Sequence, residues 1–321
     1  MKAIYQTQYG KSDVLQFGEQ DLPKLKGKEL RIRNHAASVN PRDWLIRAGR
    51  YQLQFLVPSF PLILGSDFAG EIVALGDDVE GFHVGDKVFG MKNPSEGLAT
   101  YAEEVLAPAE NVAIIPDGIS YVDAAGVPLC SLTAWQALVN KAGLKSGMSV
   151  LIIGASGGVG CYAVQIARAL GAEVTAVCSG KNSAMVTELG ASQVVDYNQC
   201  DFLKEGNSYD IIFDTIGRHK LDVCKPVMNP GGIYVSTIPT PENLKSMMIT
   251  KIKSLFSKPC KKTSVVMVKS SGDDLEKIAD LIVSGRLRPI IDRVFPMQEA
   301  SQAHDYSRSL RARGKIVLKI S

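Results

Sequence analysis

The sequence lacks the features that would place it quickly in a familiar class of protein. Its six cysteines include no pair at the CxxC spacing typical of metal and redox motifs. It has no run of about 18 apolar residues, the length of a transmembrane helix, and its first residues contain no apolar signal-peptide core. We therefore expect a cytoplasmic protein whose thiols are reduced and mostly buried.

A strong excess of charge is absent as well. Lys and Arg number 36 against 33 for Asp and Glu, a formal net charge of +3. Proteins that bind nucleic acid through its phosphates usually have a much larger basic excess, so we expect no nucleic-acid partner. The 321 residues are 45% hydrophobic and 21% charged, the ordinary balance of a globular protein. This length predicts about two domains.

Two patterns divide the chain. Up to about residue 120, short extended runs alternate with Gly and Pro, as in 29–33, 70–76 and 86–90, which is typical of a small β-rich domain. From about Ala124 onward, short apolar strands alternate with helical stretches. That alternation predicts βαβ units around a parallel sheet, so the expected fold class is α/β.

A glycine-rich turn lies in the clearest of these units. The apolar strand 150–153 is followed by the turn 154–160 (GASGGVG) and then by a helix with apolar residues at helical spacing. Such a turn gives a dinucleotide pyrophosphate both room and the N–H groups of a helix N-terminus. The spacing is GxxGxxG rather than GxGxxG, so a purely structural turn is the alternative. Its place between strand and helix favours a cofactor site.

The end of the next strand decides between the two nicotinamide cofactors. An acid there binds the ribose hydroxyls of NADH and repels the 2′-phosphate of NADPH. The segment 178–182 contains no acid, and the first carboxylate after the strand is Glu188. Ser179 and Lys181 instead offer a hydroxyl and a cation, which favour NADPH. A solvated lysine at a helix start is the alternative interpretation of Lys181.

Longer motifs carry a resemblance to a known family. They are 38–44 (SVNPRDW), 61–70 (PLILGSDFAG), 85–90 (GDKVFG), 132–138 (LTAWQAL), 154–160 and 313–318 (RGKIVL). With these motifs in this order, the chain resembles the zinc-free medium-chain dehydrogenases/reductases of the quinone oxidoreductase branch. Within that branch it is most similar to the reticulon-interacting and chloroplast-envelope quinone oxidoreductase homologues and to the alkenal/enone reductases.

The resemblance implies a Rossmann-type, doubly wound parallel sheet inserted into a GroES-like, β-rich catalytic domain. The catalytic domain would comprise residues 1–124 and 264–321, and the cofactor domain residues 125–263. By position, the residues around NADPH would be Asn40, Thr133, Thr215 and Ile216 at the nicotinamide, Gly157, Gly158 and Val159 at the pyrophosphate, Ser179, Lys181 and Tyr197 at the adenosine end, and Arg313 and Lys315 across the cleft. Ser156, in the same turn, is a further predicted cofactor-binding residue. Tyr197 is explained equally well as a core tyrosine, and Arg313 equally well as a solvated arginine.

The resemblance also implies that no metal is bound. Zinc-bearing relatives have a cysteine where this chain has Asn40, and a histidine where it has Pro41 or Ser66. The lobe that holds their structural zinc would fall near residues 92–98, which contain no cysteine. The four histidines are scattered without ligand spacing, whereas zinc needs three or four converging ligands. We therefore expect no metal site.

Without zinc, hydride delivery is easiest to an acceptor that stabilises negative charge by conjugation. We predict an NADPH-dependent, zinc-independent oxidoreductase whose substrate is a quinone or an α,β-unsaturated carbonyl compound. Asn40 is the first candidate catalytic residue, as a hydrogen-bond donor, and Tyr51 is a hypothetical proton donor. The alternative is an NADPH-binding sensor or interaction scaffold in which turnover is incidental, because the same residues would serve it.

Two further expectations concern association. The stretch 245–262 has six lysines, no acid and several apolar residues. A weak contact with a membrane surface is conceivable for such a stretch, and a solvated helix is the more ordinary interpretation. The resemblance also implies a homodimer.

Overall fold

The computed structural model describes residues 1–97, 100–256 and 260–320, with the backbone alone for 251–256. The chain forms two compact units. Unit 1 comprises Met1–Leu129, Lys269–Ser284 and Arg288–Ser321, and unit 2 comprises Cys130–Val268 and Gly285–Leu287. Both main divisions fall five residues later than the expected ends at 124 and 263. At the second division the reason is β14 (Lys262–Val265), which is a strand of the sheet in unit 2.

Unit 2 is built on a parallel sheet of six strands, in the spatial order β11-β10-β9-β12-β13-β14. The other five strands are β9 (Ser149–Ile153), β10 (Glu173–Cys178), β11 (Gln193–Asp196), β12 (Tyr209–Asp214) and β13 (Met228–Ser236). The central strand β9 is buried on both faces, since the side chains of Val150, Leu151 and Ile152 are fully buried. Strands of this kind need helices on both sides.

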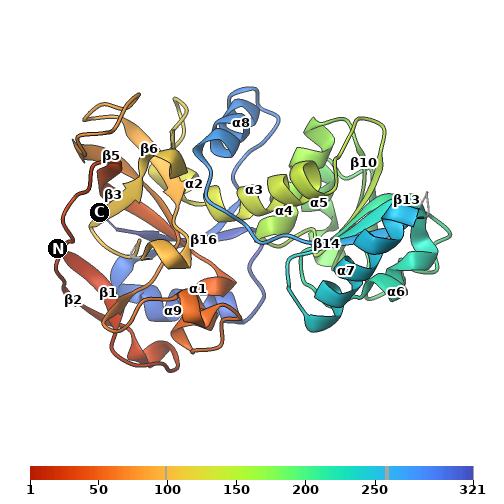
Figure 1. Cartoon of the computed structure of the whole chain (residues 1–321), viewed down its shortest axis with the longest axis horizontal. Helices are drawn as coiled ribbons and strands as arrows, with labels where there is room; N and C mark the ends of the chain where they lie inside the picture. The colour runs from red at the N-terminus through yellow and green to blue at the C-terminus, as the bar shows by residue number, and fades with distance from the viewer. Residues whose placement is uncertain (98–99, 257–259, 321) are drawn as a thin grey trace. The chain divides into compact units, whose positions relative to one another are not determined.

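The helices of unit 2 cover both faces of this sheet. They are α4 (Gly158–Ala169), α5 (Ser183–Glu188), α6 (Leu221–Cys224) and α7 (Pro241–Phe256), with η5 (Gln136–Lys141), η6 (Gly180–Asn182) and η7 (Lys225–Val227) between elements, and α3 (Pro128–Trp135) at the start. The chain moves to one side of β9 through α4 and α5 and to the other through α6 and α7, so right-handed crossovers put the two pairs on opposite faces. Figure 1 shows this arrangement. The predicted α/β fold is confirmed.

Unit 1 is rich in short strands, as predicted. One sheet has the order β2-β1-β4, and the other has the order β15-β16-β3-β5-β6-β8, with β7 also paired to β3. The strands are β1 (Lys2–Gln6), β2 (Gln16–Glu19), β3 (Glu29–Val39), β4 (Leu62–Ile63), β5 (Asp67–Leu75), β6 (Lys87–Met91), β7 (Glu104–Pro108), β8 (Val112–Ile114), β15 (Ile291–Pro296) and β16 (Lys315–Lys319). Apart from the parallel pair β15 and β16, neighbouring strands are antiparallel.

Helices and short turns complete unit 1. They are α1 (Pro41–Arg47), α2 (Tyr121–Ala125), α8 (Gly272–Val283) and α9 (Ala300–Arg308), with 3-10 turns η1 (Ser12–Val14), η2 (Gln54–Leu56), η3 (Pro94–Glu96), η4 (Ala109–Asn111) and η8 (Met297–Glu299). Ser271 caps the N-terminus of α8, because its hydroxyl oxygen accepts a hydrogen bond from the Asp274 N–H at 3.1 Å.

The long strand β3 organises the core of unit 1. Leu30 and Ile32 on β3 pack with Phe68 and Ile72 on β5 in one buried cluster. Toward its carboxyl end β3 still pairs with β5, and Ser38 lies opposite Asp67. The strand pairing therefore brings the end of β3, where Asn40 follows, next to the start of β5.

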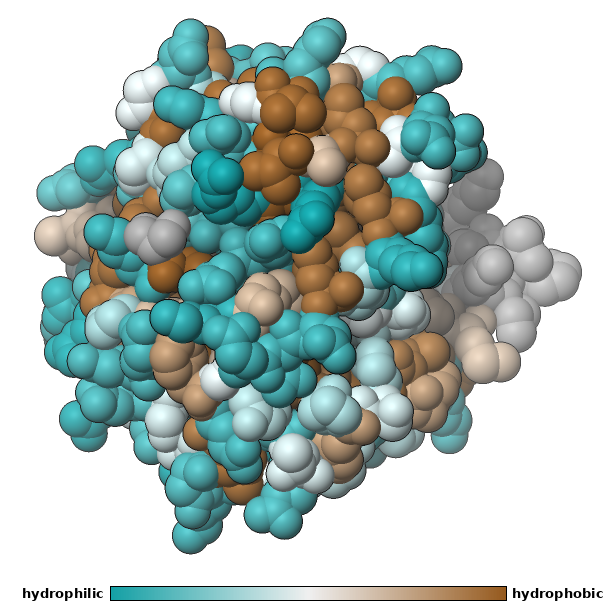
Figure 2. Space-filling view, turned by 90° about the vertical axis from the view of Figure 1, so that its left-hand side faces the viewer, coloured by the Kyte–Doolittle hydropathy of each residue, from teal (hydrophilic) through white to brown (hydrophobic). Residues whose placement is uncertain are grey.

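The surface gives two further observations. Figure 2 shows one face of the molecule, on which apolar side chains gather in one band among polar ones. Among the residues that the structure describes, no helix is both long enough and apolar enough to cross a bilayer.

Candidate functional site

The carboxyl ends of β9 and β12 form the switch point of the sheet in unit 2. From β9 the chain adds β10 and β11 on one side, and then returns to add β12 on the other. Ligands of open parallel α/β sheets bind in the crevice where the loops diverge at such a point. The turn 154–160 follows β9, and Thr215 and Ile216 follow β12. The structure thus brings these predicted residues together.

Two glycines allow the turn to pack closely. Gly154 has a φ of +81°, in the left-handed region, and a Cβ there would lie 2.6 Å from the Thr215 hydroxyl oxygen. A Cβ on Gly160 would lie 2.2 Å from the carbonyl oxygen of Gly154. At Gly157, by contrast, the nearest described atom outside its chain neighbours to an added Cβ is the Gly154 carbonyl oxygen at 3.4 Å. Two glycines therefore serve packing, and the third leaves open space.

That open space lies at the N-terminus of α4. Gly157 precedes the helix without a side-chain cap, and Gly158 and Val159 are its first residues. The first N–H groups of a helix have no intrahelical acceptor, and the helix dipole makes this end partly positive. The residues present therefore fit the pyrophosphate of a dinucleotide, as the sequence predicts.

The predicted adenosine end follows β10. Ser179 is 9% exposed, Lys181 is exposed, and Tyr197 is 60% exposed. The backbone N–H of Tyr197 donates to the Cys178 carbonyl oxygen at 3.2 Å, which brings Tyr197 beside Ser179. A core tyrosine is therefore not the explanation of Tyr197. Asn182, which the sequence reasoning did not single out, bridges Ser179 and Ser156 through its side-chain nitrogen.

An acid also lies close to this segment, although the sequence shows none before Glu188. Strand pairing places Asp196 opposite Cys178, and a Cβ on Gly180 would lie 2.4 Å from Asp196 Oδ2. The N–H of Asn198 donates to the Asp196 carboxylate at 3.0 Å and, with further bonds from Asn198, Gly180 and Gln199, lowers its pKa. The carboxylate is thus ionised and engaged by its own loop. Successive parallel strands end side by side, which is the signal that would have found it.

A second missed acid holds the loop after β12. Asp214 is fully buried and accepts the N–H groups of Ile216 at 3.0 Å, Gly217 at 2.8 Å and His219 at 3.0 Å. Burial by itself would raise the pKa of Asp214, but the hydrogen bonds from the side chain and backbone of His219, and from Gly217 and Ile216, outweigh it and lower the pKa. The charged Asp214 therefore fixes the segment that carries Thr215 and Ile216.

Two threonines predicted near the nicotinamide lie in unit 2. The Thr215 hydroxyl donates to the Ile153 carbonyl oxygen at 2.8 Å, and Ile216 beside it is 41% exposed. Thr133 lies on α3, is 6% exposed and has a partner of its own. Thr215 therefore ties the ends of β9 and β12 together.

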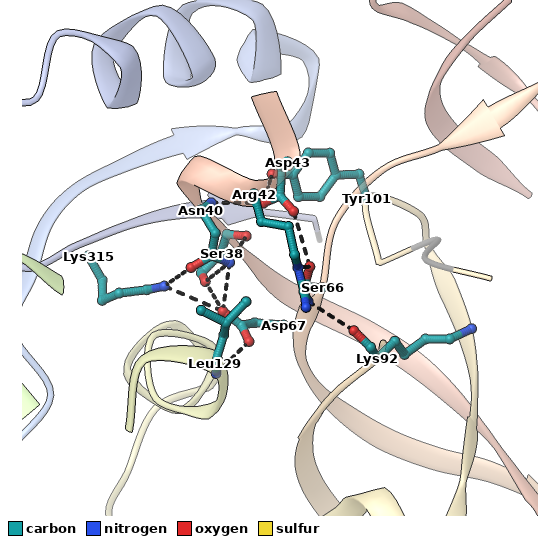
Figure 3. Close-up of polar contacts among 10 residues, drawn as sticks. All are labelled: Ser38, Asn40, Arg42, Asp43, Ser66, Asp67, Lys92, Tyr101, Leu129 and Lys315. Atoms are coloured by element: carbon teal, nitrogen blue, oxygen red, sulfur yellow. Dashed lines mark hydrogen bonds and ion pairs between the residues drawn. The ribbon is translucent and has the colours of Figure 1, made fainter. Parts of the chain in front are cut away.

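In unit 1, Asn40 lies in a buried polar cluster that Figure 3 shows. It follows β3 and is 1% exposed. Its Nδ2 donates to Asp67 Oδ2 at 3.0 Å, and its Oδ1 accepts a hydrogen bond from the Lys315 ammonium. The two ends of the amide are thus held by opposite charges, so its orientation is fixed.

Asp67 is the centre of this cluster. It is fully buried and accepts hydrogen bonds from the Ser38 hydroxyl and from the Leu129 N–H, the latter at 2.8 Å (Figure 3). Lys315, 2% exposed on β16, lies 3.4 Å from the same carboxylate. The cluster therefore joins β3, β5, β16 and the start of α3. Arg313, two residues before Lys315, is exposed.

A second buried carboxylate anchors α1. Asp43 accepts the Asn40 N–H at 2.8 Å, the Tyr101 hydroxyl at 3.0 Å and the Ser66 hydroxyl at 3.1 Å. Burial raises the pKa of Asp43, while neighbouring Arg42 opposes the rise. Arg42 in turn donates to Ser66 at 3.1 Å (Figure 3).

Tyr101 continues this chain of contacts into the core. Its hydroxyl lies 3.3 Å from His304 Nε2, and His304 Nδ1 lies 3.1 Å from Arg47 Nη1. Since arginine can only donate, Nδ1 accepts, and Nε2 therefore carries the hydrogen. Burial, followed by the charge of Arg47, lowers the pKa of His304 to about 3, so the imidazole is neutral.

The candidate proton donor Tyr51 lies outside this cluster. It is partly buried and packs against the apolar cluster of Ile46, Leu62 and Leu64. Its hydroxyl makes no hydrogen bond in the described part of the chain. The structure thus does not bring Tyr51 together with Asn40, and both catalytic assignments stay predictions.

A metal centre needs several ligand side chains that converge on one point. In residues 1–97, 100–256 and 260–320, no three His, Cys, Asp or Glu side chains are grouped so that they could hold a metal ion. At the positions where zinc-bearing relatives supply ligands, Asn40 binds Lys315 and Ser66 binds Asp43. These donors are thus engaged in hydrogen bonds within the protein.

Comparisons with known proteins find relatives that match almost the whole chain. A family model for the alcohol dehydrogenase GroES-like domain matches residues 26–117, and one described as zinc-binding dehydrogenase matches residues 189–318. The mitochondrial NAD(P)H oxidoreductase RTN4IP1 of Danio rerio is 32% identical over 97% of this chain and 89% of that protein. The chloroplast envelope quinone oxidoreductase homolog of Arabidopsis thaliana is 32% identical over 99% and 98%. The 2-methylene-furan-3-one reductase of Solanum lycopersicum is 30% identical over 99% and 79%.

A solved structure extends the likeness to three dimensions. The Escherichia coli quinone oxidoreductase complexed with NADPH matches with a TM-score of 0.84 and 25% identity, over 100% of both chains. That relative was solved with NADPH bound.

Proposed function

Because this chain belongs to the quinone oxidoreductase branch of the medium-chain dehydrogenase/reductase superfamily, we propose that it transfers hydride from NADPH to a quinone or an α,β-unsaturated carbonyl compound, without zinc. The observation that carries the proposal is the turn after β9, where packing requires Gly154 and Gly160 while Gly157 leaves open space at the helix N-terminus. A bound nicotinamide cofactor supplies the hydride.

The residues of the chain would bind the cofactor and orient the acceptor beside it. The N–H groups at the N-terminus of α4 would favour the negative charge of a bound phosphate. Asp214 holds the loop of Thr215 and Ile216 in one conformation, and the Lys315 and Asp67 pair holds the Asn40 amide in one orientation. Such preorganised polar groups suit an acceptor that develops negative charge during hydride transfer. A quinone or enone spreads that charge by conjugation, so the reaction does not require a metal.

Selectivity for NADPH is the finer part of the proposal. Ser179 and Lys181 support it, because they offer a donor and a cation where the 2′-phosphate would lie. Asp196 opposes it with a negative charge near Gly180, but the carboxylate is engaged by Asn198 and Gln199. We expect the cation to prevail, so Lys181→Ala should weaken NADPH binding about tenfold and leave NADH binding unchanged. Equal weakening of both would contradict this selectivity.

The experiment for the reaction itself combines binding and turnover. The protein is titrated with NADPH by calorimetry and then assayed for NADPH oxidation with a panel of quinones, enones and alkenals. Saturable binding with turnover of at least one conjugated acceptor supports the proposal. Tight NADPH binding with no turnover of any acceptor would favour the sensor or scaffold alternative instead.

Three expectations about the cellular context remain predictions. These are the cytoplasmic location, the homodimer and a weak membrane contact. Exposed apolar bands such as that in Figure 2 mark association surfaces in many proteins, and sedimentation velocity would test the dimer. In the stretch 245–262, Met248 is 65% exposed and Lys245 is exposed, while the side chains of 251–259 lie outside the described residues. Salt-sensitive binding to anionic vesicles would test the membrane contact.

A further inference from the structure

Asn182 joins two segments that carry predicted phosphate contacts in unit 2. Its Nδ2 lies 2.9 Å from Ser156 Oγ, in the turn after β9, and 3.2 Å from Ser179 Oγ, after β10. Its backbone N–H donates to the Ser179 carbonyl oxygen at 2.8 Å, and its side chain is 7% exposed. One buried side chain therefore fixes the relation between two serines that are distant in sequence.

The Asn182 side chain does not cap the helix that it precedes. Asn182 directly precedes α5, where an asparagine oxygen commonly accepts a hydrogen bond from the first N–H groups of the helix. Here it makes no capping bond. Its Oδ1 is buried and has no hydrogen-bond partner in residues 1–97, 100–256 and 260–320. Buried polar atoms without partners are uncommon in folded proteins, and an amide oxygen can only accept, so this oxygen indicates a ligand with a hydrogen-bond donor, such as the ribose hydroxyl beside the phosphates of a dinucleotide.

The contacts of Asn182 also decide how the two serine hydroxyls are directed. A hydroxyl has one hydrogen to donate and two lone pairs that accept. Because Asn182 Nδ2 donates to both, Ser156 and Ser179 accept these bonds and keep their own hydrogens. Within the described residues, neither hydroxyl donates its hydrogen to another protein atom. Both are thus set as donors, and the oxygens of an ionised phosphate offer only acceptors.

We propose that Asn182 is a positioning residue that directs the Ser156 hydroxyl to the pyrophosphate and the Ser179 hydroxyl to the 2′-phosphate, and thereby contributes to selectivity for NADPH over NADH. This inference rests on the proposed function, since it assumes that unit 2 binds a nicotinamide dinucleotide. NADH lacks the 2′-phosphate and would use only the contact of Ser156. Loss of Asn182 should therefore weaken NADPH binding more than NADH binding.

The test compares dissociation constants of NADPH and NADH for the full-length protein and for Asn182→Leu, measured by calorimetry. Leucine has nearly the shape of asparagine but no donor. We expect NADPH to bind about thirtyfold more weakly and NADH about threefold, so that selectivity falls about tenfold. Thr187→Ala, at an exposed position of α5, is the matched control and should change neither constant.

A Ser179→Ala protein serves as a second background for the substitution of Asn182. It separates the positioning role of Asn182 from a merely structural one. If Asn182 acts through the Ser179 hydroxyl, the same substitution in a Ser179→Ala protein should change selectivity less than about twofold. An equal loss of selectivity in both backgrounds would overturn the inference. So would an unchanged ratio of the two constants in a variant that unfolds at the wild-type temperature.

Two controls keep these outcomes distinct. Asn182→Ala, which removes the donor and leaves space rather than filling it, replaces Asn182→Leu if the leucine variant unfolds at a lower temperature than the wild type. Failure of the wild-type protein to bind NADPH would instead overturn the proposed function. NADPH binding that is equal in the wild type and in both folded Asn182 variants would overturn the role of Asn182 alone.

Discussion

The ammonium nitrogen of Lys315 lies 3.4 Å from the carboxylate of Asp67, and these side chains are 2% and 0% exposed. The pair joins β16 to the start of β5, across 248 positions of sequence. Burial of two charges is costly, and their mutual attraction and hydrogen bonds offset that cost only while both are present.

Removal of the cation should therefore destabilise unit 1. Lys315→Met leaves the Asp67 charge buried, and we expect the free energy of unfolding to fall by about 3–5 kcal/mol. Urea unfolding measures the change, and adding Asp67→Asn to the same protein should restore part of the loss. Lys319→Met, exposed on the same strand, is the control. Unchanged stability of Lys315→Met would show that the pair is not needed.

The two roles of glycine in the turn after β9 can be separated. Gly160→Ala would place a Cβ 2.2 Å from the Gly154 carbonyl oxygen, so we expect a lower unfolding temperature. Gly157→Ala has only a 3.4 Å contact and an ordinary φ of −84°, so it should fold as the wild type does. Its methyl group would occupy the space expected for the pyrophosphate, and NADPH affinity should fall at least about tenfold. Full affinity in Gly157→Ala would place the phosphates elsewhere.

Lys92 is a buried ammonium for which the described residues provide no hydrogen bond or ion pair. The nearby Glu96 carboxylate is engaged by Asn93 and Asn111. Burial lowers the pKa of Lys92 from 10.5 to about 8, with Glu96 opposing the change. The unfolded chain thus binds more protons between pH 8 and 10.5, and stability rises with pH across this range.

Replacement of Lys92 by methionine should remove this cost. At pH 7 we expect Lys92→Met to be more stable than the wild type, by at most about 3 kcal/mol. The difference should shrink as the pH rises above 8 and vanish above 10.5, where the wild-type amine is neutral in both states. Chemical denaturation at pH 7 and pH 10 measures both values. Lys87→Met, exposed on β6, is the control, and a less stable Lys92→Met at pH 7 would refute the prediction.

His304 should contribute to acid unfolding. Its pKa is lowered from 6.5 to about 3 by burial and by Arg47, so below pH 6.5 the unfolded chain binds a proton that the folded chain does not. Stability from this residue is complete above pH 6.5 and is lost as the pH falls toward 3, by up to about 1.4 kcal/mol per pH unit. The raised pKa of Asp43 changes the stability in the opposite direction. Asp43 is present both in the wild type and in the His304→Asn variant, so it does not affect their comparison.

The comparison is between the wild type and His304→Asn. Asparagine retains an acceptor for Arg47 but does not titrate, so its stability should depend less steeply on pH between 6.5 and 3. Equilibrium unfolding at intervals across this range gives both slopes. Equal slopes would show that His304 is protonated in the folded protein.

The amino-acid sequence by itself determined the alternation of strands and helices in unit 2 and the glycine-rich turn 154–160. Apolar runs between glycines predicted the strands of unit 2, and the turn 154–160 predicted a site at the end of β9, because these patterns depend on neighbours in the chain. Only the tertiary structure brought Asp196 beside Gly180, Asn182 between Ser156 and Ser179, and Lys315 onto Asp67. Those contacts depend on strand register and on the burial of charge, which join residues that no local pattern relates.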